Sequence, residues 1–389
     1  MSQRLLQIFH RHFILVMALG VGLSFLGGCK TVSEGGGADP LKPLVFPEPP
    51  DAPRFFYERT LRSGFDAKPK KEDDADSLDL RKVITGEAEG GGAERFGKPY
   101  GVTAFKGRVY VGDTVSRTVW MLDPAKGRSK EIGKEDPGGL LKPMGMRNDA
   151  KGNLYVVDGT KKTVVVFDQD GKYLRTMGGP DFFENPSAVA VNPEGTRVYA
   201  LDTGSTQGKP EFHRLQVFDG QSGKHLFSIG KRGRGDGELN LARDVAMGPD
   251  GLLYVVDGGN FRIAVFDQQG KFQRAFGTVG RRLGQFARPK GIAIDNENNL
   301  YVSDASHANF QIFNKEGQLL MFIGTRGNET ERAKYLLPAM LSLDEDGRVY
   351  MVDQGFRKVD VFRPARLKEE EGALGLAFKA LSKMKIKEN

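Results

Sequence analysis

Cysteine is almost missing from this sequence, and other residues that carry chemistry are few. The 389 residues include one cysteine, Cys29, and five histidines. A lone cysteine has no disulfide partner and no companion for a cysteine-based zinc site. No glycine-rich phosphate loop, nucleophile elbow or haem-attachment motif occurs. The apolar run at residues 13–25 is well short of the roughly 20 residues that a membrane-spanning helix needs. These absences argue against a disulfide-stapled domain, a phosphate-loop enzyme and a transmembrane helix.

The first 28 residues have the layout of a secretory signal, with Arg4 and Arg11, an apolar middle and small residues at the end. Leu-Gly-Gly-Cys at residues 26–29 resembles the lipobox of bacterial lipoproteins. This resemblance implies that residues 1–28 are a signal peptide and that Cys29 carries the lipid; a buried free cysteine is the alternative. Lys30 at the next position favours, by the same resemblance, the outer membrane of a Gram-negative cell. We expect the body of the protein to face the periplasm or the cell surface.

The charge balance is weakly basic, at +7 for the whole chain. Loss of Arg4 and Arg11 would leave 55 basic and 50 acidic residues, a net charge of +5. Because we expect export, we predict no nucleic-acid partner. Anionic lipid, an anionic glycan or an acidic patch on an envelope protein is the expected counterpart.

A phrase of the type Leu-Tyr-Val-Val-Asp recurs at intervals of 44 to 55 residues. Its aspartates are Asp113, Asp158, Asp202, Asp257, Asp304 and Asp353. Such a period indicates a propeller or similar array. Each unit reads as four short strands separated by glycine-rich turns. Residues 95–363 therefore predict an all-β fold, a six-bladed β-propeller of four-stranded antiparallel blades.

The motifs Pro-Lys-Gly-Ile-Ala at 289–293, Asn-Leu-Tyr-Val-Ser-Asp at 299–304 and Gln-Ile-Phe at 311–313 resemble the NHL repeat. Six copies resemble the six-bladed NHL propeller. The third unit departs from the pattern, because Asp202 and Asp219 are 17 residues apart where the other units have 10. The inserted stretch includes residues 207–213.

The sixth unit has no fourth strand of its own, so we expect residues 54–94 to supply one and close the ring. Within them, residues 55–63 are the favoured segment and residues 80–86 the alternative. Residues 29–53, rich in glycine and proline, predict a flexible tether. Residues 364–389 predict an amphipathic helix over 367–387, interrupted by Gly372 and Gly375. We expect it to pack on the propeller's side; a membrane or partner helix, suggested by Lys383, Lys385 and Lys387, is the alternative.

The recurring aspartates predict a structural role rather than catalysis. A residue required once per blade serves the blade, and its carboxylate most simply accepts backbone N–H groups in the following turn. We assign none of the six to catalysis.

A unique site is expected where a unit breaks its own pattern. Arg147 occupies a first-strand position that holds Thr, Ala or Ser in other units. At the position of the Pro-x-Gly motif the fourth unit has Ala-Arg243-Asp244, where the next unit has Pro-Lys290-Gly. These residues are candidates for ligand binding at the channel. A local ion pair that bridges blades is the alternative.

The loops that lead into blades 4, 5 and 6 gather basic residues. Residues 231–243, 280–290 and 325–335 carry net charges of +2, +4 and +1. The candidates for contact with an anionic ligand or partner are Lys231, Arg232, Arg234, Arg243, Arg281, Arg282, Lys290 and Arg326. They predict a basic arc on one face, near Arg262, His307, Arg357 and Lys358.

We therefore predict a lipid-anchored binding or scaffold propeller without a cofactor. The alternative is a metal-dependent enzyme, because some NHL propellers are lyases with histidine-held zinc and lactonase-like propellers hold a divalent ion. The histidines that would remain after signal cleavage, His213, His225 and His307, fall in different units, and no spacing singles out Asn148 or Asp149.

Overall fold

The structure, a computed structural model, describes residues 43–64 and 95–385, with side chains to residue 380. The predicted signal peptide, Cys29, most of the predicted tether and the alternative closing segment at 80–86 lie outside these residues. In the part of the chain that is described, no helix is long and apolar enough to cross a membrane.

The fold is a six-bladed β-propeller, as predicted. From the innermost strand outward, blade 1 has β3 (Pro99–Phe105), β4 (Arg108–Asp113), β5 (Thr118–Asp123) and β6 (Arg128–Ile132). Blade 2 has β7 (Pro143–Asn148), β8 (Leu154–Asp158), β9 (Thr163–Phe167) and β10 (Tyr173–Gly178). Blade 3 has β11 (Pro186–Val191), β12 (Arg197–Asp202), β13 (Arg214–Asp219) and β14 (His225–Ile229).

Blade 4 has β15 (Val245–Met247), β16 (Leu253–Asp257), β17 (Arg262–Phe266) and β18 (Phe272–Phe276). Blade 5 has β19 (Pro289–Ile294), β20 (Leu300–Asp304), β21 (Asn309–Phe313) and β22 (Leu319–Ile323). Blade 6 has β25 (Pro338–Leu343), β26 (Val349–Asp353), β27 (Lys358–Pro364), β2 (Phe55–Leu61) and β1 (Val45–Phe46). The short strands β23 (Thr325–Arg326) and β24 (Lys334–Tyr335) pair in the loop before blade 6, and the 3-10 turns η3 (Pro124–Lys126) and η4 (Pro210–Phe212) lie in blades 1 and 3.

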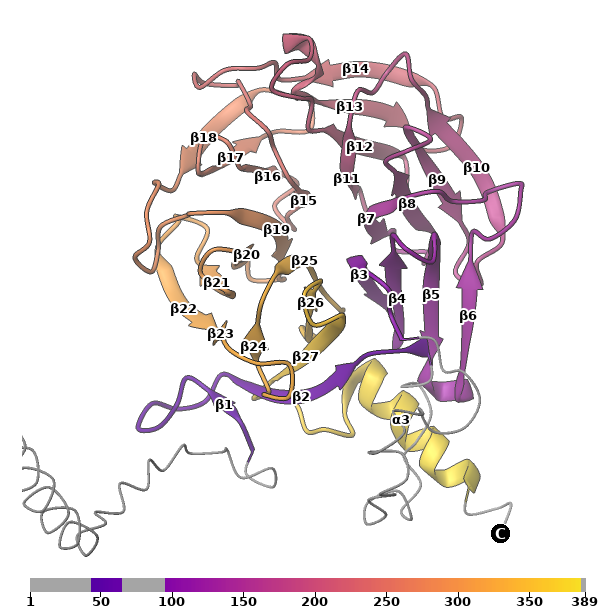
Figure 1. Cartoon of the computed structure of the whole chain (residues 1–389), viewed down its shortest axis with the longest axis vertical. Helices are drawn as coiled ribbons and strands as arrows, with labels where there is room; N and C mark the ends of the chain where they lie inside the picture. Colours follow the sequence, from indigo (N-terminus) through magenta and orange to yellow (C-terminus); the bar gives the residue numbers. More distant parts are fainter. Residues whose placement is uncertain (1–42, 65–94, 386–389) are drawn as a thin grey trace, which may run out of the picture. The chain divides into compact units, whose positions relative to one another are not determined.

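The innermost strands contact one another in a closed circle, from β3 through β7, β11, β15 and β19 to β25 and back to β3 (Figure 1). The middle strands are buried along almost their whole length, because each radial blade packs against a neighbour on both faces. The outermost strands alternate between half-buried and exposed residues. A blade alone would leave both apolar faces in water, so the blades are stable only as a ring.

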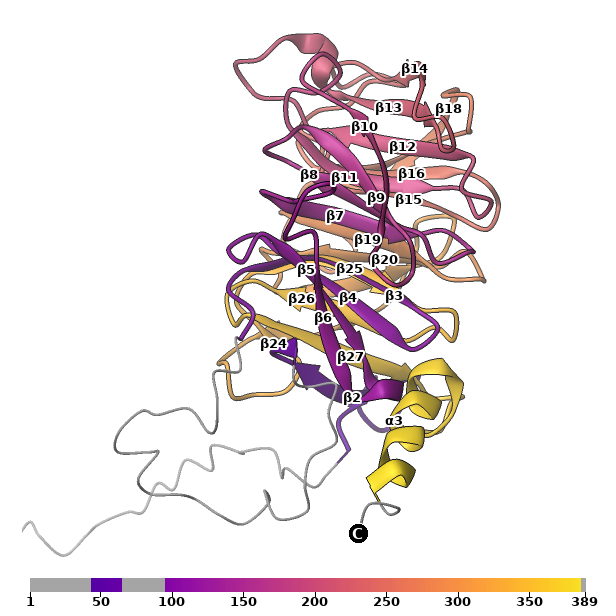
Figure 2. The same ribbon diagram turned by 90° about the vertical axis from the view of Figure 1, so that its right-hand side faces the viewer.

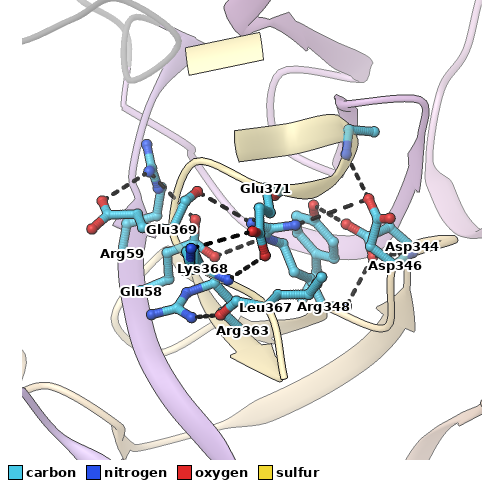
Figure 3. A network of polar contacts seen from close by, with 12 residues as sticks. Glu58, Arg59, Asp344, Asp346, Arg348, Arg363, Leu367, Lys368, Glu369 and Glu371 are labelled. Atoms are coloured by element: carbon cyan, nitrogen blue, oxygen red, sulfur yellow. Dashed lines mark hydrogen bonds and ion pairs between the residues drawn. The ribbon is translucent and has the colours of Figure 1, made fainter. Parts of the chain in front are cut away.

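The N-terminal strand β2 closes this ring by pairing antiparallel with β27, beside the yellow C-terminal strands in Figure 1. The favoured closing segment is therefore confirmed. Side chains reinforce the pairing: Thr60 donates to Asp360 across 2.5 Å, and Arg348 Nε lies 2.8 Å from Glu58 Oε2 (Figure 3). β1, within the stretch predicted as tether, adds a further strand, and Phe46 packs edge-on against Phe362 at 5.8 Å.

The C-terminal helix α3 (Gly372–Lys385) packs beside η3 and the closing strand (Figure 2). Leu374 and Ala377 are buried, and the Arg59 guanidinium lies 3.7 Å from the Phe378 ring centre. The expectation of a helix packed on the propeller's side is confirmed for the side chains up to residue 380. The side chains of Lys383 and Lys385, and Lys387 as a whole, lie outside the described residues.

The predicted start of this helix at residue 367 is wrong. Residues 367–371 form turns because two arginines hold their carbonyls. Arg348 donates to the carbonyls of Glu369 and Glu371, and Arg363 donates to that of Leu367. The helix begins at Gly372, whose φ of +73° suits glycine. Gly375 does not interrupt it.

Candidate binding face

The propeller has two faces of different construction. One face, here called the connection face, carries the segments that lead into each blade and the turns between its second and third strands. It comprises residues 95–98, 133–142, 179–185, 230–242, 277–288 and 324–337 and turns 114–117, 159–162, 203–213, 258–261, 305–308 and 354–357. The opposite face carries the first-to-second and third-to-fourth strand turns, because antiparallel strands reverse direction at each turn.

A buried apolar side chain anchors each segment that leads into a blade. These anchors are Phe96, Leu140, Phe183, Leu239, Phe286 and Tyr335. Before blades 4, 5 and 6 the segment also pairs with itself in parallel, through Arg232 and Leu239, Val279 and Phe286, and β23 with β24. The connection face is thus held in shape from within.

The recurring aspartates fix the same segments, which confirms their structural interpretation. All six are fully buried. Asp304 accepts backbone N–H groups from Ala287 and Arg288 in the preceding loop, at 2.8 and 2.9 Å, and from Ser306 and His307 in the following turn. Burial raises the pKa of Asp202 and Asp257, while hydrogen bonds to their carboxylates oppose the rise. The aspartates therefore join each blade to the loop before it.

Four of the predicted contact residues are exposed arginines without a side-chain partner among the described residues: Arg234, Arg281, Arg282 and Arg326. Lys231 lies 3.5 Å from Glu238, and Arg232 donates to the Thr206 carbonyl at 3.1 Å; both are exposed. These side chains lie on the connection face of blades 4, 5 and 6, as predicted from the topology.

Two neighbouring cations are structural instead. Arg262 donates to Asp257 at 2.8 Å and to carbonyls of the loop before blade 4, including those of Arg234 and Glu238. Lys358 is buried with Asp360 at 2.7 Å. Both charges are neutralised inside the fold, so the accessible basic arc is smaller than the sequence predicts.

Arg147 and Asp244 meet across the central channel, which supports the ion-pair alternative for these two candidates. Arg147 Nη2 lies 3.0 Å from Asp244 Oδ2 and 2.8 Å from the Ile292 carbonyl. Asp244 also accepts the backbone N–H groups of Val245 and Ile292. Burial raises the pKa of Asp244, and the Arg147 guanidinium opposes the rise. This contact joins blades 2, 4 and 5.

Arg243 and Lys290 occupy the same corner position in neighbouring blades, where the innermost strands start. Neither side chain has a hydrogen-bond or ion-pair partner within the described ranges. The pKa of Lys290 is lowered to about 8. The main cause is partial burial, followed by the nearby Arg243 and Arg288 guanidinium groups, while the Asp304 carboxylate has a weaker effect in the opposite direction. Two adjacent cations without a counter-ion form a place where an anion would be stabilised.

Two cavities were not predicted. One, of about 170 Å³, lies where the innermost strands end and is lined by Arg147, Asn148, small side chains such as Ala190 and Ser342, and larger apolar side chains such as Met247. The other, of about 450 Å³, lies beside blade 5 between β1 and β22, with Phe46 and Phe322 in its lining. No sequence signal marks the second cavity, because ring closure brings its two walls together.

The histidines do not gather, although the expectation that each lies in a different unit is wrong, because His213 and His225 both belong to blade 3. His213 is buried, accepts the Leu241 N–H at Nδ1 and faces the Ser205 carbonyl at Nε2, so it fastens the blade 3 insertion to the next loop. His225 contacts Gln216 and His307 lies beside Asp304. In residues 43–64 and 95–380, no three His, Cys, Asp or Glu side chains are placed to hold a metal.

Comparison with known proteins identifies the repeat and the fold. The NHL repeat matches residues 239–266, which include the loop before blade 4 and strands β15, β16 and β17. No curated protein matches the sequence. Similar solved structures include an auxiliary nutrient binding protein from Bacteroides thetaiotaomicron VPI-5482, with 13% identity, a TM-score of 0.51 and 69% of each chain covered.

Hydrazine synthase from Kuenenia stuttgartiensis is similar at 18% identity and a TM-score of 0.52, over 72% of this chain and 88% of that one. A gluconolactonase from Xanthomonas campestris is similar at 16% identity and a TM-score of 0.50, over 69% and 86%. Likeness at such identities establishes the fold and leaves function to the site.

Proposed function

For this six-bladed propeller with an NHL repeat, we propose a role as a lipid-anchored binding module of the bacterial cell envelope. It binds an anionic envelope ligand or an acidic partner through the connection face of blades 4, 5 and 6. The single observation that carries this proposal is the set of exposed, unpaired arginines at Arg234, Arg281, Arg282 and Arg326. They project from loops that buried anchors and aspartates hold in place.

The physical basis is preorganisation. When a cation lies on a fixed loop, an anion can bind without the entropic cost of ordering the backbone. Adjacent cations also add their electrostatic potentials, which extend over a Debye length of about 10 Å at 0.1 M salt. Arg243 and Lys290 extend the same charge toward the channel. Attachment through Cys29 would hold this face close to envelope components.

The test is binding of poly-L-glutamate to the full chain at low salt. We expect Arg281→Ser, Arg282→Ser and Lys290→Ser together to weaken binding on the order of tenfold, with the difference shrinking as salt is raised. The matched control removes three exposed lysines from the opposite face, Lys151→Ser, Lys224→Ser and Lys271→Ser, and should change binding little. Equal effects of the two triple variants would contradict the proposal.

The anchor has its own test. Export of the wild-type chain in a Gram-negative host should give a membrane-bound protein whose N-terminal peptide carries acyl mass on Cys29. Cys29→Ser should abolish that modification. An unmodified Cys29 in the membrane-bound protein would contradict the proposed lipid anchor. It would not bear on the proposed binding face.

A further inference from the structure

Exposed apolar side chains are distributed unevenly over the two faces. Five large apolar residues on loops, Val115, Leu141, Val279, Leu283 and Leu336, are between 39% and 64% exposed. All five lie on the connection face, in blades 1, 2, 5 and 6. The other exposed large apolar residues of the described chain belong to outer strands or to α3: Leu174, Leu226, Leu320, Phe322 and Leu376. The turns of the opposite face contribute none of them.

These five side chains are interleaved with cations. Val279 and Leu283 flank the exposed Arg281 and Arg282 in one loop. The pattern repeats on neighbouring blades, where Leu141 precedes Lys142, Val115 is two residues before Arg117, and Leu336 packs against Gly355, two residues before Arg357. Nearby acids are partly neutralised: Glu329 lies 2.9 Å from Arg62, and Asp136 lies 3.4 Å from Lys161.

The loop with the densest pattern has a fixed shape. The Gly280 N–H donates to the Phe286 carbonyl at 3.0 Å, and the Phe286 N–H donates to Thr278 at 2.9 Å. The Gln285 and Gln311 amide oxygens accept the N–H groups of Arg282 and Gly284. Because Phe286 is the buried anchor, Val279 and Leu283 are not needed for the core. Val279 and Leu283 are therefore exposed because the hydrogen-bonded loop holds them there, and not because the loop lacks a fixed conformation.

The opposite face is acidic and polar by contrast. Its turns repeat an aspartate that accepts backbone N–H groups: Asp149, Asp168, Asp219, Asp250, Asp267, Asp295 and Asp344. The opposite face thus carries these turn carboxylates, of which Asp149 and Asp344 are buried, together with exposed lysines such as Lys151, whereas the connection face presents aliphatic tips among arginines. A membrane with anionic headgroups is the surface that matches the connection face, because aliphatic tips enter the headgroup boundary while cations contact phosphates.

We propose that the connection face of blades 5, 6, 1 and 2 lies on an anionic lipid bilayer, with the 279–283 loop inserted deepest. This inference rests on the proposed function: it shares the basic loops before blades 5 and 6 with the proposed binding face, extends that face to blades 1 and 2 in place of blade 4, and names its ligand as the lipid surface. A protein partner is disfavoured because the apolar tips are aliphatic side chains spread over four segments, with only Val279 and Leu283 in the same loop, and none lines either of the two cavities described above. Specific protein interfaces instead centre on contiguous, well-packed clusters with aromatic anchors.

The test uses the full chain attached to vesicles by its own N-terminus. Leu283→Cys is labelled with the environment-sensitive fluorophore NBD. The lipidated Cys29 has no free thiol and does not react, and wild-type chain treated in the same way gives the background from any unlipidated protein. In vesicles containing phosphatidylglycerol we expect a blue-shifted emission that doxyl-labelled lipid quenches. In pure phosphatidylcholine vesicles the shift should be several-fold smaller. Adding Arg281→Ser and Arg282→Ser should reduce it to a similar extent.

The matched control is Lys151→Cys on the opposite face, whose probe should stay in water on both kinds of vesicle. A water-exposed Leu283→Cys probe on phosphatidylglycerol vesicles would overturn the inference. If poly-L-glutamate still binds through the three basic residues in that case, the proposed binding face stands and only its lipid identity fails. If neither polymer nor vesicle engages the face, both fail.

Discussion

Arg348 and Glu58, which are 290 residues apart in the sequence, form a 2.8 Å ion pair whose side chains are 0% and 1% exposed. Glu58 belongs to the closing strand β2, and Arg348 immediately precedes β26 of the same blade. The same guanidinium donates to the carbonyls of Glu369 and Glu371 before α3 (Figure 3). One buried arginine therefore links ring closure to the position of the C-terminal helix.

Replacing Glu58 by glutamine should destabilise the protein strongly. The change removes the carboxylate 2.8 Å from Arg348 and leaves the buried charge only the more distant pair with Asp346 at 3.9 Å. Breaking a buried pair typically costs about 3–5 kcal/mol. We expect a lower midpoint in chemical denaturation, with β2 and α3 losing hydrogen-exchange protection together.

The control for this prediction is Lys315→Met, which breaks an exposed pair between Lys315 and Glu316. Such a surface pair contributes about 0–1 kcal/mol, so its loss should leave the midpoint nearly unchanged. A similar small change for Glu58→Gln would mean that the buried pair does not secure the closure.

Arg147→Met separates the two interpretations of the channel residues. It leaves Asp244 buried without its guanidinium, so we expect a loss of about 3 kcal/mol in unfolding free energy. Poly-L-glutamate affinity should stay within twofold of wild type, because the paired Arg147 charge is already neutralised. A large loss of affinity in a folded Arg147→Met protein would restore Arg147 as a ligand-binding residue.

Much of the fold was predictable because each blade repeats its own signals. An aspartate at the end of a buried strand recurs wherever a carboxylate holds the loop before its blade and the turn that follows, so Asp113 and Asp353 define blades as clearly as Asp257 does. The closing strand was also predictable, since the sixth unit lacked a partner. Arg348 was not: neither its burial nor its contact with Glu58 follows from a local pattern. The start of α3 was mispredicted for the same reason, because distant arginines hold residues 367–371.

The candidate site was predictable only in outline. Charge counts in the loops located Arg281 and Arg282 correctly, but they could not separate exposed cations from neutralised ones. In the sequence Arg262 and Lys358 cannot be told apart from the exposed basic residues near them. In the structure, ion pairs with Asp257 and Asp360 neutralise their charges. Val279 was not singled out from the sequence, because only the structure shows that Phe286 is the buried residue of this loop and that Val279 is exposed.

Arg262→Met should loosen the loop that presents Arg234. The wild-type guanidinium donates to the carbonyls of Arg234, Gly235 and Glu238, so its loss frees the backbone of that loop. We expect faster amide hydrogen exchange in residues 233–239 and a fewfold weaker poly-L-glutamate affinity, because the loop must then be ordered on binding. Arg274→Met, on the outer strand β18, is the control. Unchanged exchange in residues 233–239 would show that the buried anchor Leu239 and the hydrogen bonds to Asp257 and Asn260 hold the loop without Arg262.

Polyanion binding should depend on pH through Lys290. Its free-protein pKa is lowered to about 8 by half-burial and by Arg243 and Arg288, with Asp304 opposing. A bound anion favours the ammonium and raises this pKa, so binding above pH 8 requires uptake of a proton. Affinity should therefore be flat below about pH 8 and fall as pH rises further, by up to about tenfold per pH unit. Tyr100, also near Arg243, has its pKa raised to about 12 by burial and does not titrate in this window.

Lys290→Arg provides the decisive comparison, because arginine keeps the charge and stays protonated throughout this range. Its affinity should match wild type below pH 8 and lose the decline above it. The measurement is isothermal titration of poly-L-glutamate from pH 7 to pH 9.5 at constant ionic strength, in two buffers that differ in ionisation enthalpy. Proton uptake should appear in wild type and be absent in Lys290→Arg. A decline shared by both proteins would assign the pH dependence to another group and leave Lys290 outside the binding face.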